Sequence, residues 1–269
     1  YFDSFDSMAR ASVLEYPEIK KLCEDFDAEL SVECEELGED YKNILSLAYR
    51  QAIGAHKLVY DRDGELLFLS KENDSNGCIG TLDVTYPSIP LFLKYAPELV
   101  KGMMRPVFRF AKSDAWKFDF APHDVGCYPL VNGQVYGENA LKYQMPVEEC
   151  GNMLVMAYSY YKVTGDKEFL KENFALLSRW ADFLKMKGID LDNQLCTDDF
   201  AGHSKRNVNL AIKSIMGRAC YNKICDALDI ADESFYEAKQ DAAKLIALCE
   251  SDTYLPFALS KKDSWSLKY

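Results

Sequence analysis

The chain has 269 residues, of which 48% are hydrophobic and 28% are charged, so it is long and apolar enough to bury a sizeable globular core. The net charge of −12, with no basic stripe, argues against binding to nucleic acid or to an anionic membrane surface. No apolar run approaches the roughly 20 residues of a membrane span, so we expect no membrane insertion.

In chain order, helices are predicted at about 16–36 and 42–57, joined by a brief turn at Gly38. The stretch "KLVYDRDGELLFLSK" (57–71) predicts a β-hairpin, because two apolar runs flank an Asp-Arg-Asp-Gly turn. A short helix is expected from about Ser88, with a break near Pro97 and a second helix to about Lys112.

Two further helical pairs follow the long polar segment 113–146. A nearly all-apolar helix from about Val147 turns at 164–166 into an amphipathic helix, with Asp166 as its N-cap. Another helix is predicted from about Ser204, and it turns near Asp232 into a helix ending around Cys249. The terminal "SWSLKY" (264–269) is predicted to start one more helix.

The first helices of successive pairs are expected near 88, 147, 204 and 265, at a period of roughly 60 residues that indicates a helical-hairpin repeat. Because short turns and long loops alternate, the long loops must emerge at one end of the array. A solenoid and a closed α/α toroid both fit, and the long loops favour the toroid. We therefore expect an all-α fold, a single α/α-toroid domain over 1–269 with the inserted β-hairpin.

Polar motifs gather at the long-loop end, which is typical of an acid/base site. The candidate catalytic residues are Glu148, Glu149, Asp198 and Asp199. The candidate substrate-binding residues are Asp83, His123, Asp124, Asn152, Asn207, Trp116 and Tyr128.

Plainer interpretations exist for each candidate. Acidic residues in the first turn of a helix are stabilised by its dipole by about 0.3–1 kcal/mol. Asp198 and Asp199 could form an Asx-turn, His123 could hydrogen-bond a loop carbonyl, and aromatic residues could anchor loops. Neighbouring helical residues point about 100° apart, so we expect only one of Glu148 and Glu149 to face the site while the other caps or pairs with a loop.

The sequence gives little indication of cofactors. His56, His123 and His203 are far apart, and none lies four residues from another, so we expect no metal. There is no P-loop and no GxGxxG, and we expect no other cofactor. The nine cysteines are odd in number and lack a CxxC, which argues against a disulfide framework.

Several motifs together resemble the glutaminase A family: "SKENDSNGCIGTLDVTYPSIPLFL", "FAPHDVGCYP", "MPVEECGNM" and "QLCTDDFAG". The resemblance implies a six-hairpin α/α toroid like that of many glycosidases, incomplete in this chain. It also implies an upstream β-rich domain and further C-terminal helices, so the chain is expected to be a fragment. A periplasmic or extracellular location is implied too, although the cysteine usage does not support an oxidising compartment.

The resemblance implies a hydrolase that releases ammonia from the glutamine side chain, with carboxylates activating water. No GxSxG or SxxK nucleophile motif is found. One alternative is a glycoside hydrolase with an inverting carboxylate pair about 6.5–9.5 Å apart. A second is a non-catalytic helical binding or scaffold domain. The expected partner is thus a small-molecule amide or carbohydrate.

Overall fold

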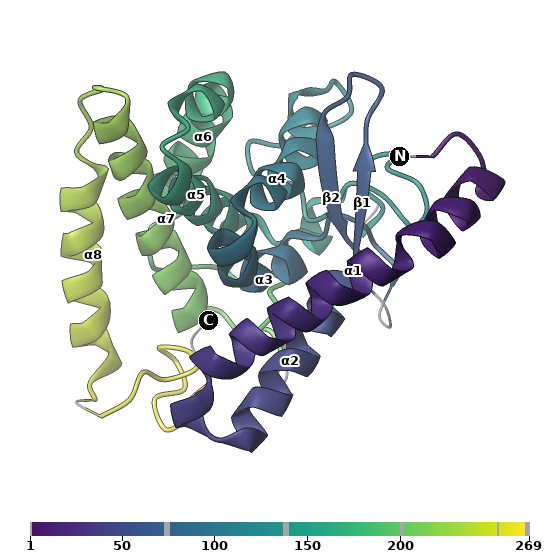
Figure 1. Cartoon of the computed structure of the whole chain (residues 1–269). Coiled ribbons are helices and arrows are strands. Elements are labelled where there is room, and N and C mark those ends of the chain that lie inside the picture. The colour runs from purple at the N-terminus through teal and green to yellow at the C-terminus, as the bar shows by residue number, and fades with distance from the viewer. Residues whose placement is uncertain (1, 73–75, 137–139, 200–201, 252, 267–269) are drawn as a thin grey trace.

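A computed structural model describes residues 2–72, 76–136, 140–199, 202–251 and 253–266. The predicted all-α fold with a small β-hairpin is confirmed (Figure 1). The helices are α1 (Phe5–Glu33), α2 (Glu39–Gly54), α3 (Leu82–Tyr95), α4 (Pro97–Lys112), α5 (Pro146–Thr164), α6 (Lys167–Lys187), α7 (Val208–Ala227) and α8 (Ser234–Cys249). The hairpin consists of β1 (His56–Tyr60) and β2 (Leu66–Ser70), which pair antiparallel with His56 opposite Ser70.

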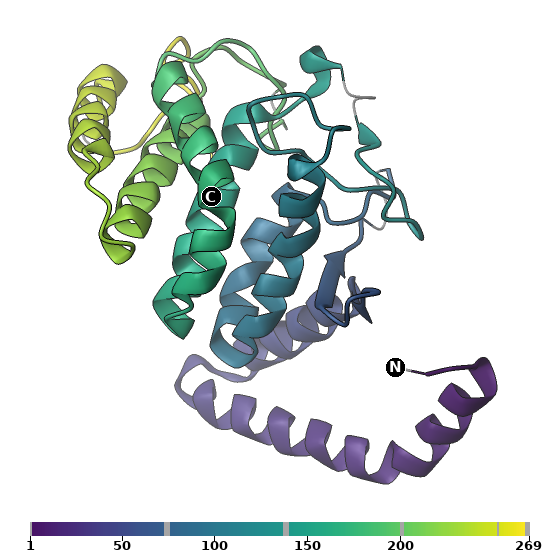
Figure 2. The ribbon, with the colours of Figure 1, turned by 90° about the horizontal axis from the view of Figure 1, so that it is seen from above.

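From α3 onward the helices form hairpins in two rows (Figure 2). In the inner row, α5 packs against both α3 and α7, and each of these three helices also packs against the helix that follows it in the chain. Long connections lead into α3, α5 and α7, so the first turns of the inner helices lie at the same end of the array. Twelve residues of α5 and fourteen of α7 are buried, because both inner helices are packed against other helices on several sides.

The core of the repeat is a continuous cluster of large side chains from α3 to α7. Trp180 of α6 is 1% exposed and stacks on Phe108 of α4 at a centroid distance of 5.4 Å. Asp166 caps α6 by accepting a hydrogen bond from the Phe169 backbone N–H, as predicted from the sequence. The core therefore fixes the inner helices on which the polar end is built.

Helix α3 begins at Leu82, whereas the sequence analysis expected a helix only from about Ser88. Pro87 and Pro90 lie inside α3, and prolines are disfavoured there because they lack the N–H that an interior helix position donates. Burial of Leu82, Thr85, Ile89 and Phe92 along one face outweighs this local preference. The earlier start places Asp83 within the first turn of α3, rather than in the loop before it.

Three other boundaries differ from the sequence analysis. Helix α1 starts at Phe5, where Ser4 and Ser7 form a capping box, and not near 16. Helix α7 starts at Val208, not near Ser204, because the Asn207 side chain accepts the Leu210 N–H as the N-cap. Residues 264–266 are not helical, and 267–269 of the last predicted helix lie outside the described residues.

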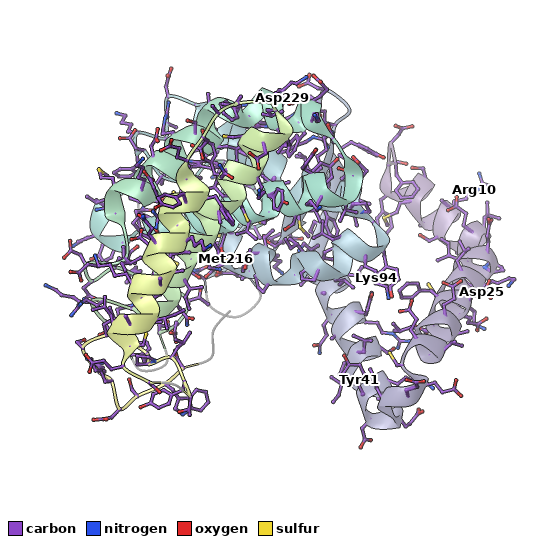
Figure 3. The ribbon with its side chains drawn as sticks, turned by 90° about the vertical axis from the view of Figure 1, so that its left-hand side faces the viewer. Arg10, Asp25, Tyr41, Lys94, Met216 and Asp229 are labelled. Carbon is purple, nitrogen blue, oxygen red and sulfur yellow. The ribbon has the colours of Figure 1, made fainter. Side chains whose placement is uncertain are left out.

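The hairpin of α1 and α2 projects from the body (Figure 3). It is attached near the C-terminal end of α1, where Phe26, Tyr49 and Tyr95 make edge-to-face contacts with ring centroids 5.2–5.5 Å apart. Lys94 of α3 also forms an ion pair with Glu33. Among the described helices, none has a stretch that is both long and apolar enough to cross a lipid bilayer.

Candidate functional site

Thr197 joins the first turns of two inner helices. Its backbone N–H donates to Glu148 Oε2 at 2.9 Å, and its hydroxyl donates to Asp83 Oδ2 at 3.1 Å. Glu148 is in the first turn of α5, Asp83 is in the first turn of α3, and Thr197 is in the loop before α7. Three segments that are far apart in the sequence therefore bring their polar groups together at the long-loop end.

Glu149 is completely buried beside this junction. Its Oε2 accepts a hydrogen bond from Asn152 Nδ2 at 3.0 Å, while Oε1 has no hydrogen-bond partner among the described residues. Burial, together with the negative charges of Asp83 and Glu148, raises the pKa of Glu149 well above its ordinary value. These surroundings favour the protonated carboxylic acid.

Glu148 has a different environment although it is the next residue. Burial raises the pKa of Glu148, but the Thr197 N–H and the charge of Lys213 stabilise the carboxylate and oppose that rise. The surroundings of the two adjacent carboxyl groups thus differ: Glu148 accepts a backbone N–H, whereas Glu149 accepts one side-chain amide and lies closer to being neutralised by burial and by neighbouring negative charges. A pair of this kind can divide the roles of base and acid.

Lys213 is a functional candidate that the sequence analysis missed. It is 3% exposed on α7, and its Nζ donates to Asn152 Oδ1 at 2.8 Å. The ammonium also lies 3.6 Å from the centroid of the Tyr86 ring, which stabilises the cation. Burial lowers the pKa of Lys213 to about 8, against the opposing charges of Glu148 and Glu149. The available signal was a lysine close to the start of an inner helix, among the apolar residues Leu210, Ala211, Ile212 and Ile215.

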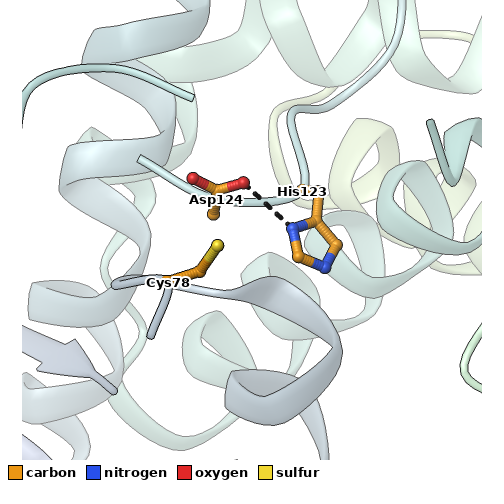
Figure 4. A group of neighbouring side chains, drawn as sticks. All are labelled: Cys78, His123 and Asp124. Carbon is orange, nitrogen blue, oxygen red and sulfur yellow. Dashed lines mark hydrogen bonds and ion pairs between the residues drawn. The ribbon is translucent and has the colours of Figure 1, made fainter. Parts of the chain in front are cut away.

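Asp124 is fully buried and holds the adjacent loop in place (Figure 4). Its Oδ1 accepts the backbone N–H groups of Gly126 at 3.2 Å and Val135 at 3.0 Å. Its Oδ2 accepts the Tyr136 N–H at 3.1 Å and lies 3.0 Å from His123 Nδ1. Asp124 therefore fixes both the loop backbone and the orientation of the imidazole.

His123 is 2% exposed and stacks on the Tyr136 ring at a centroid distance of 4.3 Å. Its second nitrogen, Nε2, lies 3.8 Å from Asp83 Oδ1, across the cluster from Asp124. Burial lowers the pKa of His123, but the hydrogen bond with Asp124 and the charge of Asp83 outweigh it, so the pKa ends above its ordinary value. His123 is thus held by a side-chain carboxylate, and not by a loop carbonyl.

The two aspartates before α7 have separate surroundings. Asp198 is buried, and its Oδ2 accepts Asn209 Nδ2 at 2.8 Å and the Ser266 hydroxyl at 3.0 Å. Asp199 is exposed; burial raises the pKa of Tyr136, and the charge of Asp199 adds to that rise after those of Asp83 and Glu72. Asp199 is therefore the more accessible of the two, whereas Asp198 has hydrogen bonds that fix the loop.

Three other predicted residues have structural contacts outside this cluster. Asn207 is the N-cap of α7. Trp116 is buried against Phe118 and donates its Nε1–H to the Phe120 carbonyl at 2.7 Å, so it anchors a loop and presents no ring for stacking on a sugar. Tyr128 is 45% exposed, with Lys71 Nζ 4.5 Å from its ring centroid.

Within the part of the chain that the structure describes, two groups of side chains have the spacing of metal ligands, and both include His123. One is Cys78, His123 and Asp124, and the other is Glu72, Asp83 and His123. Within each group the ligand atoms lie within 4.8 Å of one another. The sequence analysis expected no metal because it compared only the spacing between histidines, which does not show carboxylates brought in from other segments.

Residues 38–269 match the family described as the glutaminase A six helical-hairpin domain. The chain belongs to this family. The match includes every element that contributes to the cluster, whereas α1 lies before it.

Relatives of this glutaminase A family domain include two fungal proteins. Glutaminase A of Aspergillus oryzae is 35% identical over 205 residues, which cover 76% of this chain and 29% of that protein. A probable glutaminase of Arthroderma benhamiae is 29% identical over 248 residues, covering 71% of this chain and 28% of the relative. The chain therefore spans less than a third of the length of the curated relatives it matches.

Proposed function

We propose that this domain hydrolyses the side-chain amide of glutamine at the cluster around Glu148 and Glu149. The names of the two relatives support glutamine as the substrate. The observation that carries the proposal is the contrast between two adjacent buried carboxyl groups. Glu148 accepts the Thr197 N–H, whereas Glu149 is buried, its Oε1 has no hydrogen-bond partner among the described residues, and its pKa is raised well above its ordinary value.

In the proposed reaction, Glu148 acts as the general base. It takes a proton from water as the water oxygen forms a bond to the carboxamide carbon. The carbonyl π electrons move to the oxygen, and this gives a tetrahedral intermediate. A carboxylate that is hydrogen-bonded in its charged form suits this role, because that hydrogen bond opposes the rise in pKa that burial causes.

Glu149 acts as the general acid in the second half of the reaction. It gives its proton to the amide nitrogen as the carbon–nitrogen bond breaks, and ammonia and the carboxylic acid are released. Glu148 then holds a proton and Glu149 is ionised, so transfer of one proton between them restores the starting state. Lys213 orients Asn152, and Asn152 in turn holds Glu149, so Lys213 acts as a positioning residue.

The test is to measure ammonia released from glutamine by the protein expressed from its complete gene, with a panel of oligosaccharides assayed in parallel. Glu148→Gln and Glu149→Gln are each expected to lower kcat by about 10²–10⁴-fold, which is the usual contribution of a general acid or base. Asp199→Asn tests the exposed carboxylate of the same end. Glu172→Gln, on the exposed face of α6, is the matched control and should leave kcat unchanged.

Full activity in both glutamate variants would refute the site. Release of sugar without ammonia would replace the amidase with the glycoside hydrolase alternative. If the folded protein releases neither ammonia nor sugar, the result supports the alternative of a non-catalytic binding or scaffold domain.

A further inference from the structure

We propose that Glu72, Asp83 and His123 form a binding site for one divalent transition-metal cation. This site goes beyond the proposed amide hydrolysis, in which Glu148 and Glu149 carry out the proton transfers. The three ligand atoms all lie within 4.8 Å of one another. They come from the segment after β2, the first turn of α3 and the loop between α4 and α5, so the fold alone brings them together.

The spacing of His123 and Asp83 suits a shared ion better than a direct contact. His123 Nε2 and Asp83 Oδ1 are 3.8 Å apart, which is too long for a hydrogen bond. Two ligand atoms that are each about 2.1 Å from one ion lie roughly 3.0 Å apart at a right angle and roughly 4.2 Å apart when opposite. The observed separation falls inside that interval.

His123 is already oriented as a ligand. Asp124 fixes Nδ1, and the stacked Tyr136 ring limits rotation of the imidazole. A histidine that binds a metal through one nitrogen normally gives its other N–H to a carboxylate or carbonyl, which fixes the tautomer. Asp124 provides this second contact, and Nε2 is left directed at Asp83.

The environment of Asp83 is independent evidence for a cation at this site. Its Oδ1 is buried and has no hydrogen-bond partner among the described residues, although Oδ2 accepts the Thr197 hydroxyl. A buried carboxylate oxygen without a partner is strongly unfavourable unless a positive charge compensates it. The nearby carboxyl groups of Glu148 and Glu149 increase that need, because Asp83 interacts unfavourably with both.

The other group, Cys78, His123 and Asp124, does not compete for the ion (Figure 4). Both oxygens of Asp124 already accept backbone N–H groups, and His123 Nδ1 is engaged with Asp124. This group therefore orients the imidazole for the site on its opposite side.

One imidazole nitrogen and two carboxylate oxygens suit Zn²⁺, Mn²⁺ or Co²⁺ better than Ca²⁺ or Mg²⁺, which prefer oxygen ligands alone. The test is calorimetric titration of chelator-treated protein with each of these five ions, without substrate. Co²⁺ binding is also followed by its visible absorption. We expect one equivalent of a transition-metal ion to bind.

His123→Gln and Asp83→Asn should each weaken binding by at least about tenfold, since each removes a ligand. Glu72→Gln should weaken it as well, and its half-buried side chain makes loss of the fold a smaller risk. The matched controls are His203→Gln and Asp114→Asn, which remove a histidine and an aspartate outside the site and should bind as the unmodified protein does. Circular dichroism checks that each variant is folded.

The proposal is overturned if none of the three transition-metal ions binds more tightly than about 1 mM. Undiminished binding in folded Glu72→Gln and His123→Gln proteins would overturn it equally. Because binding is measured without substrate, these outcomes are distinct from those of the ammonia assay.

Discussion

Glu149 couples the stability of the fold to pH at the scale of a single residue. Its carboxyl group is protected from water, and the nearby charges of Asp83 and Glu148 further oppose its ionisation. In the unfolded chain, the same group ionises near its ordinary pKa of 4.5. Folding is therefore favoured when Glu149 is protonated, and each unit by which its pKa is raised corresponds to about 1.4 kcal/mol.

The variant Glu149→Gln should become progressively more stable than the unmodified protein as the pH rises. A group with a raised pKa in the folded state contributes its full stability below pH 4.5, and that contribution is lost as the pH rises through the folded value. Glutamine cannot ionise and so shows no such loss. Thermal unfolding from pH 4.5 upward measures the difference, with Glu172→Gln as an exposed control. Parallel pH curves for the two proteins would contradict the prediction.

The sequence could predict which carboxylates lie at the long-loop end, but not how they are partnered. The helical period placed Glu148 and Glu149 at the start of an inner helix, where the structure has them. Lys213 was not predictable, because the sequence does not show that its ammonium reaches Asn152 on the neighbouring helix. The grouping of Glu72, Asp83 and His123 depends in the same way on packing between segments.

At the scale of the elements, the close approach of α5 and α7 carries Lys213 to the glutamate pair. A Cβ built on Gly217 would lie 3.1 Å from Gly151 Cα, so the two helices meet where both lack a side chain. A Cβ on Gly151 would lie 2.9 Å from the Lys213 carbonyl oxygen and would also overlap the Lys213 side chain. Glycine at this position therefore controls both the helix spacing and the position of Lys213.

Gly151→Ala should destabilise the protein by about 1–3 kcal/mol, because the methyl group forces two packed backbones apart. It should also lower amidase activity by displacing Lys213. The control is Gly54→Ala at the end of α2, where nothing lies within 4 Å of the added Cβ. That change should be neutral or stabilise by up to about 1 kcal/mol. Denaturant unfolding measures both, and equal stabilities would show that the helices can separate without penalty.

Helix α3 shows why element boundaries were harder to predict than the repeat. The period of the hairpins is set by long apolar runs, and these can be recognised in the sequence without knowing which helices they pack against. The start of α3 depends on burial of Leu82 and Thr85 against other helices, and that burial outweighs two internal prolines. The local sequence contains the prolines but not the neighbours against which α3 packs.

Over the whole molecule, packing is uneven between α1 and the helical repeat. Leu30 is the buried residue of α1 among those described, whereas twelve residues of α5 are buried. Large apolar side chains on α1, such as Val13 at 76% and Leu14 at 72% exposure, have little covering them. Most helical stability in proteins comes from packing of an apolar face, so α1 is held mainly at its C-terminal end.

Backbone amides in the first half of α1, about residues 5–20, should exchange with deuterium at least about 100-fold faster than those of α5. Local unfolding there separates few buried contacts, whereas α5 opens only with the core. Hydrogen exchange followed by mass spectrometry measures both helices in one experiment, so α5 serves as the internal control. Equal protection of the two helices would contradict the prediction and would mean that the exposed face of α1 is covered by another molecule.

The bridge that Thr197 makes to Asp83 spans 114 positions of the chain. A ribosome adds about 5–20 residues per second, so roughly 6–23 s pass between the synthesis of these two residues. During that interval the nascent chain contains Asp83, and later Glu148, but not yet Thr197, which donates a hydrogen bond to each of them. The bridge can therefore form only after α3, α4, α5 and α6 have been synthesised, while α7 and α8 still follow it in the chain.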